Sequence, residues 1–269
     1  GLGDAMRYAV LDGGKRLRPL LVFGACEAVE GAVAAACRAA CAVELIHAYS
    51  LVHDDMPCMD NDVLRRGKPT VHVRFGEAGA LLAGDALQAL AFELLTPADA
   101  DADAMPPPVQ ARLCALLARA AGHLGMAGGQ AIDLACVGHA LDETALRDMH
   151  QRKTGALLHA SVMMGAACGH AVAPAAAVAL SNYGTALGLA FQVVDDILDV
   201  TADSQTLGKT AGKDAAQNKP TYVSVLGLDR SRRYAAELHD QALAALAQSG
   251  LAQVRALRAL ADAVVHREN

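Results

Sequence analysis

Two clusters of carboxylates, far apart in the chain, are the residues best suited to chemistry. One lies in DDMPCMDND, which holds four aspartates within nine residues, and the other lies in DDILD. Their members are Asp54, Asp55, Asp60 and Asp62 in the first cluster, and Asp195, Asp196 and Asp199 in the second. Mg²⁺ prefers carboxylate oxygens, usually together with waters and substrate phosphates. The two clusters therefore predict a site for a divalent cation.

Basic residues follow the first cluster directly. Arg65 and Arg66 are adjacent, and Gly67 and Lys68 come next. The planar fork of arginine can bind two phosphate oxygens at once. Acids and bases this close cannot all pair with each other, whereas an anion bridged by a divalent cation would explain both sets. We interpret the stretch as a diphosphate–magnesium site. The alternative, a solvated acidic loop, does not account for the second cluster downstream.

The spacing of the second cluster predicts a helix with its acids together. Residues three and four apart share a helix face, so Asp195, Asp196 and Asp199 can all reach one side. The residues around them are almost wholly apolar. Acids that emerge from a buried helix need compensation, and a bound cation would supply it.

The elements that must position these groups are helices. The 269 residues are 54% hydrophobic and only 3% aromatic, and alanine and leucine, which favour helices, dominate. We expect an all-α fold in a single domain over residues 1–269. The expected helices span about 4–11, 20–29, 32–56, 78–95, 109–121, 126–135, 145–154, two within 155–199, 229–247 and 251–266. Residues 97–108 are expected to be an exposed connection.

Composition also excludes some classes. The net charge of −6 argues against a nucleic-acid surface, although local arginines and a metal still allow anionic substrates. Residues 155–194 contain no Asp, Glu, Lys or Arg, which raises the alternative of a membrane span. We reject stable membrane insertion, because this stretch is rich in Ala and Gly, carries His159 and Gln192, and leads into DDILD.

Cysteine usage indicates a reducing compartment. The seven cysteines are an odd number, no CxxC occurs, and most lie among apolar residues. We expect buried free thiols and a cytoplasmic protein; a zinc site is the alternative. Nothing at the N-terminus resembles a signal peptide.

DDMPCMD and DDILD resemble the two aspartate-rich motifs of the trans-isoprenyl diphosphate synthases. The sequence is most similar to the short-chain bacterial farnesyl or geranylgeranyl diphosphate synthases, from GGKRLRP at residues 13–19 to the C-terminal helix. One DDxxD alone is a weak signal, but two in this order with RRG after the first are specific. The resemblance implies a helical bundle of the isoprenoid synthase type around a central cavity. Family members usually have another helix before the first one expected here.

The resemblance also implies an activity. It is the Mg²⁺-dependent head-to-tail condensation of isopentenyl diphosphate with dimethylallyl or geranyl diphosphate, giving farnesyl diphosphate and pyrophosphate.

Several Mg²⁺ ions, with Mn²⁺ as a substitute, would be held by Asp54, Asp55, Asp60, Asp195, Asp196 and Asp199. Isopentenyl diphosphate would be bound by Lys15, Arg18, His47 and Arg66. The allylic diphosphate would be bound by Arg65 and Lys153, and Lys209 and Lys219 would close over it. Thr154 and Gln192 would lie near the developing cation, so that Lys153, Thr154, Gln192 and Arg65 form the catalytic set. The departing pyrophosphate would accept the proton.

Tyr49 is the residue expected to set product length. It lies five residues before Asp54, about 7.5 Å along a helix at 1.5 Å per residue. In the family the chain-length position lies here, with Ser50 beside it, and a large ring can close the tunnel after a short product. We therefore expect a C15 product, with a C20 product as the alternative. Tyr49 as an ordinary core residue also remains open. Gln130 and Asp133 are placed near the cavity without a defined role.

Two rival functions remain. A class I terpene cyclase shares the fold and the magnesium chemistry but takes one allylic substrate, whereas GGKRLRP and His47 favour a second diphosphate site. A non-catalytic subunit of a prenyl synthase would be expected to have lost one aspartate motif, and both are present. Family precedent suggests a homodimer.

Overall fold

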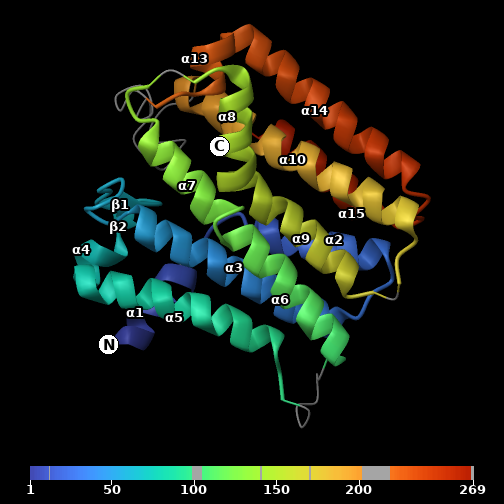
Figure 1. Cartoon of the computed structure of the whole chain (residues 1–269), viewed down its shortest axis with the longest axis horizontal. Helices are drawn as coiled ribbons and strands as arrows, with labels where there is room; N and C mark the ends of the chain where they lie inside the picture. The colour runs from blue at the N-terminus through green and yellow to red at the C-terminus, as the bar shows by residue number, and fades with distance from the viewer. Residues whose placement is uncertain (12, 99–104, 140, 170, 202–218, 268–269) are drawn as a thin grey trace.

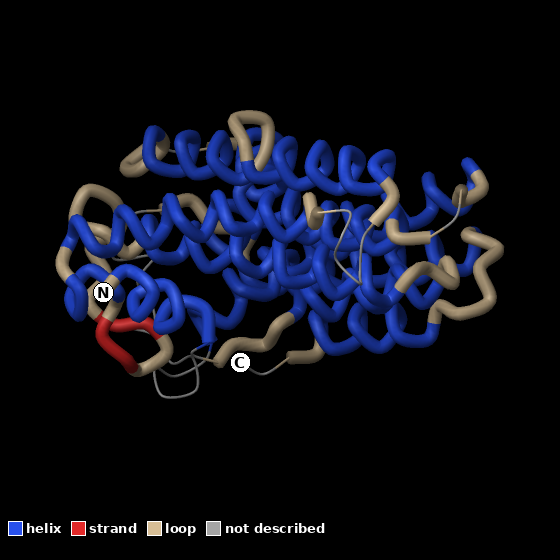
Figure 2. Tube along the Cα trace, turned by 90° about the horizontal axis from the view of Figure 1, so that it is seen from below, coloured by secondary structure: helices blue, strands red, loops and turns tan. Residues whose placement is uncertain are grey.

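The protein is a bundle of helices that run roughly along one long axis (Figures 1 and 2). The computed structural model describes residues 1–11, 13–98, 105–139, 141–169, 171–201 and 219–267. Among these residues the only strands are those of one two-residue hairpin. The all-α prediction is therefore confirmed.

The first half of the chain supplies the helices around the first acidic cluster. They are α1 (Leu2–Leu11), α2 (Leu17–Ala28), α3 (Val33–Asp54), α4 (Val71–Phe75), α5 (Glu77–Leu95) and α6 (Pro107–Ala121). α3 is central, because it packs against α1, α2, α5, α6 and α9. Its buried face is rich in alanine, and these small side chains allow the neighbouring helices to approach closely. α3 ends at Asp54, two residues earlier than expected.

The second half supplies the second acidic cluster. Its elements are α7 (Met126–Ala135), α8 (Glu143–His150), the π-helical turn η1 (Gln151–Gly155), α9 (Ala156–Ala167), α10 (Pro174–Thr201), α13 (Tyr222–Leu226), α14 (Leu228–Gln248) and α15 (Arg255–Val265). α10 carries DDILD and packs against α8, η1, α9, α13, α14 and α15. The two helices expected between residues 155 and 199 are confirmed as α9 and α10. The short helices α4 and α13 were not expected.

The π-helical turn η1 lies where we expected the last turn of the helix over residues 145–154, and two glycines let its neighbours approach it. A Cβ on Gly129 of α7 would lie 2.1 Å from the backbone nitrogen of Lys153, and one on Gly188 of α10 would lie 2.8 Å from the Gly155 Cα. No larger residue fits these contacts without movement. π-helical turns inside helices frequently occur at functional sites, and this one carries Lys153 and Thr154.

A short hairpin directs the two adjacent arginines. β1 (Leu64–Arg65) pairs antiparallel with β2 (Lys68–Pro69), and the turn residues Arg66 and Gly67 both have positive φ, 52° and 75°. Two positive φ values suit the tight turn that joins hairpin strands. The turn was not expected, and it explains why Arg65 and Arg66 find different partners.

Three helices are long and apolar enough to cross a membrane by length and composition, namely α3, α5 and α10. The apolar windows of α3 and α10 are 61% buried within the bundle, which accounts for their composition by packing; that of α5 is 33% buried.

All seven cysteines are free, as expected, but their burial is not. Only Cys26 and Cys168 are buried, whereas Cys37, Cys41 and Cys58 are exposed. The expectation of mainly buried thiols is wrong, because alanine neighbours on a helix do not reveal which face points outward.

Candidate functional site

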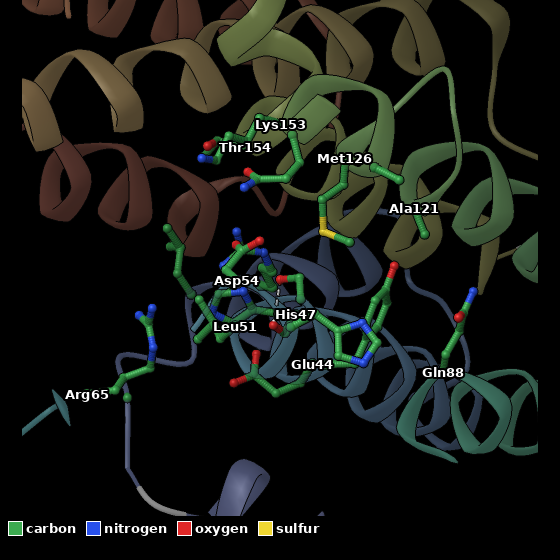
Figure 3. Close-up of a pocket in the computed structure, with 18 of the residues that line it drawn as sticks. Glu44, His47, Leu51, Asp54, Arg65, Gln88, Ala121, Met126, Lys153 and Thr154 are labelled. Atoms are coloured by element: carbon green, nitrogen blue, oxygen red, sulfur yellow. Dashed lines mark hydrogen bonds between the residues drawn. The ribbon is translucent and has the colours of Figure 1, made fainter. Parts of the chain in front are cut away.

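A cavity of about 1250 Å³ brings most of the predicted site residues together. It is lined by residues of α2, α3, α5, α6, α7, η1 and α10, by the β-hairpin, and by Arg267 near the C-terminus. In Figure 3, Lys153 and Thr154 lie on one side and Asp54, His47 and Leu51 on the other. Arg65 lies toward one end of the cavity, while Ala121, Met126 and Gln88 lie toward the opposite end. The cavity is therefore charged at one end and mainly apolar at the other.

The first acidic cluster folds back on the end of α3. The Asp60 backbone N–H donates to the Asp54 carbonyl at 2.9 Å, and the Asp62 N–H donates to the Asp55 carbonyl at 3.1 Å. Asp60 therefore returns to the side of Asp54. Burial raises the pKa of Asp54 to about 6; the nearby Asp60 adds to this rise and Lys153 opposes it. The raised pKa means that the surroundings stabilise the Asp54 carboxylate poorly, and a cation in the cavity would supply the missing stabilisation.

Asp55 does not line the cavity, because it is held by Arg65. The Arg65 Nε donates to the Asp55 Oδ2 at 2.8 Å, and the Arg65 Nη2 donates to Oδ1 at 2.6 Å. Asp55 is only 2% exposed. Burial raises the pKa of Asp55, and the Arg65 hydrogen bonds oppose that rise. Arg66 instead donates to the Gly13 carbonyl at 2.9 Å, beside the GGKRLRP segment.

The second cluster does not present all three of its acids to the cavity. Asp195 lines the cavity, whereas Asp196 is 2% exposed and Asp199 is 4% exposed. Asp196 accepts hydrogen bonds from the Gln192 Nε2 at 2.8 Å and from the Tyr222 backbone N–H at 2.7 Å. Helical spacing gave three acids one face, but α13 packs against that face and takes Asp196 as its partner.

Lys15 and Arg16 before α2, and Arg18 in its first turn, line the cavity. Arg16 bonds elsewhere, to Glu44 at 2.5 Å and to the Val10 carbonyl at 2.6 Å. The buried Arg18 Nε has no hydrogen-bond partner among the described residues. Burial lowers the pKa of Arg18 to about 10. An arginine nitrogen without a partner, next to Lys15, suits an anion.

His47 and Asp54 both line the cavity from α3. Burial lowers the pKa of His47 well below its ordinary value, and Arg18, Arg66 and Arg65 lower it further. The imidazole is therefore neutral at pH 7 and can donate one hydrogen bond.

Alternating charges link the first acidic cluster to η1. The Lys219 Nζ lies 3.0 Å from the Asp60 Oδ1 and 3.9 Å from the Asp133 Oδ2, and the Lys153 Nζ lies 2.5 Å from Asp133. Asp133, whose role was left open, thus holds two of the predicted lysines. Lys209 lies outside the described residues.

The side chains of Thr154 and Gln192 meet as well. The Thr154 Oγ1 donates to the Gln192 Oε1 at 2.9 Å, and the Gln192 amide in turn donates to Asp196. These two hydrogen bonds fix the orientation of the Gln192 amide next to Thr154, which lines the cavity. Gln130 also lines the cavity, and neither atom of its buried amide has a partner among the described residues.

Arg267 is a site residue that sequence reasoning missed. Its Nη2 lies 2.6 Å from the Asp195 Oδ1 and donates to the Phe191 carbonyl at 2.7 Å, and its guanidinium lies 4.0 Å from the Phe191 ring centroid. The side chain is 9% exposed. No local motif marks this arginine, because only the packing of α15 on α10 brings it to DDILD.

Tyr49 and Ser50 line the cavity next to His53. The Tyr49 ring lies 5.6 Å from the His53 ring, edge to face. Burial raises the pKa of the Tyr49 hydroxyl. The Ser50 hydroxyl donates to the His47 carbonyl at 2.8 Å, within its own helix. Tyr49 is therefore half-buried, lines the cavity and also packs against the hydrophobic core.

The residues at the charged end fit Mg²⁺ chemically. Asp54 and Asp195 offer hard carboxylate oxygens to one cavity, Asp60 lies beside Asp54, and the basic side chains leave room for phosphate oxygens to complete the shell. The assignment of the six aspartates as metal ligands remains a prediction.

Comparison with known proteins identifies the family. Residues 1–260 match the model of the polyprenyl synthetase family. The chain is 47% identical over 267 residues to the farnesyl diphosphate synthase of Escherichia coli K12, covering 98% of this chain and 88% of that protein. It is also 47% identical over 269 residues to the large subunit 1 of the heterodimeric geranylgeranyl pyrophosphate synthase of Arabidopsis thaliana chloroplasts, covering 99% and 72%.

A solved structure supports the same conclusion. The geranyltransferase of Helicobacter pylori, complexed with magnesium and isoprenyl diphosphate, superimposes with a TM-score of 0.88 at 35% identity, covering 98% of this chain and 88% of the other. Similarity therefore spans nearly the whole chain in both sequence and fold. The chain belongs to the polyprenyl synthetase family of prenyltransferases.

Proposed function

We propose that the protein condenses isopentenyl diphosphate with dimethylallyl or geranyl diphosphate, with farnesyl diphosphate as its main product. The observation that carries this proposal is one cavity with two basic groups beside a shared acidic centre. Lys15, Arg18 and Arg66 form one group and Lys153 lies in the other, while Asp54 and Asp195 line the space between the helices. Two basic groups suit two diphosphates, whereas a terpene cyclase needs only one.

Mg²⁺ held by Asp54, Asp60 and Asp195 would supply positive charge to the diphosphate leaving group. The side chains of the protein add to it. Lys153 and Lys219 are held by Asp133 and Asp60, and a diphosphate can draw these ammonium groups toward itself. At about 4 Å and an effective dielectric of 20, one pair of unit charges is worth roughly 4 kcal/mol. Contacts that strengthen as the leaving group gains charge favour cleavage.

In this reaction the bond between the allylic carbon C1 and the diphosphate oxygen breaks, and both electrons stay on oxygen. The double bond of isopentenyl diphosphate then attacks C1, so that a new carbon–carbon bond forms. A proton leaves the adjacent carbon to restore a double bond, and we propose that the departing pyrophosphate accepts it. Thr154 and Gln192 present their oxygens near the cationic carbon. The apolar end of the cavity excludes water that would quench the cation.

The proposed product length rests on Tyr49, which stands at the cavity wall one and a half turns before Asp54 along α3. The relatives include farnesyl and geranylgeranyl diphosphate synthases, so the product has to be measured. Radiolabelled isopentenyl diphosphate is incubated with dimethylallyl, geranyl or farnesyl diphosphate and excess Mg²⁺, and the products are separated by chromatography. We expect a C15 product from the first two partners and loss of turnover after chelation with EDTA.

Other outcomes would change the assignment. A mainly C20 product would overturn the product length and leave the reaction type intact. Hydrocarbon or alcohol release from a single allylic diphosphate would instead indicate a cyclase. No incorporation with any partner would contradict the prenyltransferase proposal and favour a non-catalytic subunit. We also propose a homodimer, which size-exclusion chromatography with light scattering can test, and a cytoplasmic location, which cell fractionation can test. Mn²⁺ is proposed as a substitute metal.

A further inference from the structure

Three side chains that can bind metal lie together where α14 packs against α15. His239 comes from the middle of α14, Asp262 from α15, and His266 from the residue that caps the end of α15. One ligand atom of each lies within 4.8 Å of the other two. Asp262 and His266 are four residues apart and therefore share a face of the helix. Two neighbouring helices thus present a His–Asp–His cluster.

The tautomer of the neutral His266 ring is determined by its contact with the backbone of α15. Its Nδ1 lies 3.0 Å from the backbone carbonyl of Asp262. Because a carbonyl can only accept, Nδ1 carries the hydrogen when the imidazole is neutral, and Nε2 keeps its lone pair. A ring nitrogen that donates to a backbone carbonyl while the other nitrogen binds metal is the usual arrangement of histidine ligands. His266 is therefore prepared as a ligand through Nε2.

His239 is less exposed than Asp262 and His266, and both of its ring nitrogens lie near a carboxylate. Its side chain is 14% exposed, its Nε2 lies 2.8 Å from the Asp262 Oδ1, and its ring is 5.5 Å from the His266 ring. On the other side, its Nδ1 lies 3.9 Å from the Asp240 Oδ1. A shift of the ring hydrogen from Nε2 to Nδ1 would direct it toward Asp240. Nε2 and the Asp262 carboxylate would then both face a bound cation.

We propose that His239, Asp262 and His266 form a binding site for a divalent transition-metal ion, with Zn²⁺ as the first candidate. Two imidazoles and one carboxylate suit Zn²⁺, whereas Mg²⁺ prefers oxygen ligands alone. Asp262 is 57% exposed and His266 is exposed, so water can complete the coordination. The site differs in ligand chemistry from the acidic centre of the cavity.

The position of His266 gives this site a structural consequence. The next residue, Arg267, reaches into the cavity and pairs with Asp195. A metal that joins the middle of α14 to the end of α15 would hold the backbone from which Arg267 extends. The site thus fastens the C-terminal segment against the wall of the substrate cavity.

Metal titration tests the site directly. Zn²⁺ or Co²⁺ is titrated by calorimetry into the full chain in the presence of excess Mg²⁺, which occupies oxygen-rich sites. We expect one additional site, weakened by about tenfold or more in His239→Ala and in His266→Ala. Asp262→Asn keeps the side-chain size and should also weaken binding. His123→Ala removes an exposed histidine elsewhere and should leave binding unchanged.

The absorption spectrum of Co²⁺ distinguishes this site from the free thiols. Nitrogen and oxygen ligands give weak visible bands, whereas thiolate ligands add strong near-ultraviolet charge-transfer bands. Unchanged binding in His239→Ala and His266→Ala, or binding that disappears only after the thiols are alkylated, would overturn the site. Circular dichroism of the metal-free variants verifies that each is folded.

Hydrogen exchange tests the fastening of the C-terminal segment. Zn²⁺ should slow exchange of the backbone amides of residues 262–267 in the unmodified chain, and it should have no such effect in His239→Ala. Equal exchange with and without saturating Zn²⁺ would refute the fastening. Because these readouts do not involve turnover, they are independent of the proposed prenyltransferase activity.

Discussion

Arg65 grips the carboxylate of Asp55 with two side-chain nitrogens, Nε at 2.8 Å from Oδ2 and Nη2 at 2.6 Å from Oδ1. The first residue of the RRG segment therefore faces back to the DDxxD segment across the hairpin. Asp55 is almost fully buried, so its negative charge depends on this arginine. The contact ties the hairpin to the end of α3, next to Asp54.

Replacement of Arg65 should destabilise the fold as well as reduce activity. Arg65→Ala leaves a buried carboxylate without its partner, and we expect a loss of about 3 kcal/mol in the free energy of unfolding. Urea denaturation at neutral pH without substrate measures it. Arg66→Ala is the matched control, because Arg66 is exposed and donates to the Gly13 carbonyl; its loss should stay below about 1 kcal/mol. Equal losses in the two variants would contradict the structural role of the Arg65–Asp55 pair.

Asp195 and Asp196 should have different roles despite being adjacent. Asp195→Asn should lower turnover by orders of magnitude and raise the Mg²⁺ concentration needed for half-maximal activity, because Asp195 lines the cavity. Asp196→Asn should reduce kcat with little change in Mg²⁺ dependence, since Asp196 holds Gln192 and the Tyr222 backbone.

Initial rates measured over a range of Mg²⁺ concentrations separate the two effects. Asp229→Asn is the control, because this side chain is 87% exposed at the start of α14, and it should behave as the unmodified protein. Asp54→Asn should behave like Asp195→Asn. An equal rise in Mg²⁺ requirement for Asp195→Asn and Asp196→Asn would return Asp196 to the predicted metal ligands.

The two basic groups should be separable by substrate. Lys15→Ala or Arg66→Ala should chiefly raise the KM for isopentenyl diphosphate, by about tenfold for the loss of one charged contact. Lys153→Ala should chiefly affect the allylic substrate, because Lys153 comes from η1, across the cavity from His47 and Asp54 (Figure 3). Steady-state kinetics with each substrate varied in turn measure both constants. Similar changes for both substrates in every variant would argue against two distinct diphosphate sites.

Tyr49→Ala should lengthen the product. The ring stands at the cavity wall and packs edge to face on His53, so its removal opens space without altering a charged contact. We expect output to shift from C15 toward C20 or longer, measured by chromatography of the dephosphorylated products. Tyr49→Phe keeps the ring and should keep the C15 product. An unchanged distribution in Tyr49→Ala would show that the ring does not limit chain growth.

His150 should make the fold sensitive to acid. Burial lowers the pKa of His150 to about 4, from an ordinary value of 6.5. Between pH 6.5 and 4 the unfolded chain therefore binds a proton that the folded protein does not, and stability falls as the pH falls through this window. The shift corresponds to about 3 kcal/mol at most.

Replacement by a neutral ring isolates this contribution. His150→Phe should lose less stability between pH 6.5 and pH 4.5 than the unmodified protein, as measured by urea denaturation at several pH values. His123→Phe, at an exposed site, should keep the original slope. Parallel pH profiles for His150→Phe and the unmodified protein would exclude His150 as the source.

The sequence by itself determined the helical class, the two acidic clusters and the family. DDxxD spacing, alanine-rich helices and GGKRLRP are local patterns, and local patterns survive without knowledge of the packing. Helical periodicity also holds within a single element, so that His47 and Asp54, seven residues apart on α3, lie on one face.

Only the tertiary structure decided which partner each charged group takes. Asp196 turned to α13, Asp55 turned to Arg65, and Asp133 took Lys153. Arg267 reached Asp195 from a position 72 residues later in the chain, and His239 met His266 from a neighbouring helix. Periodicity determines the face of a helix that a residue occupies, but the element packed against that face determines the partner. The contact between Asp55 and Arg65 joins a helix to a hairpin, and the other contacts join residues that are 20 to 72 positions apart. The energy of such pairs depends on how the elements pack, which no local pattern encodes.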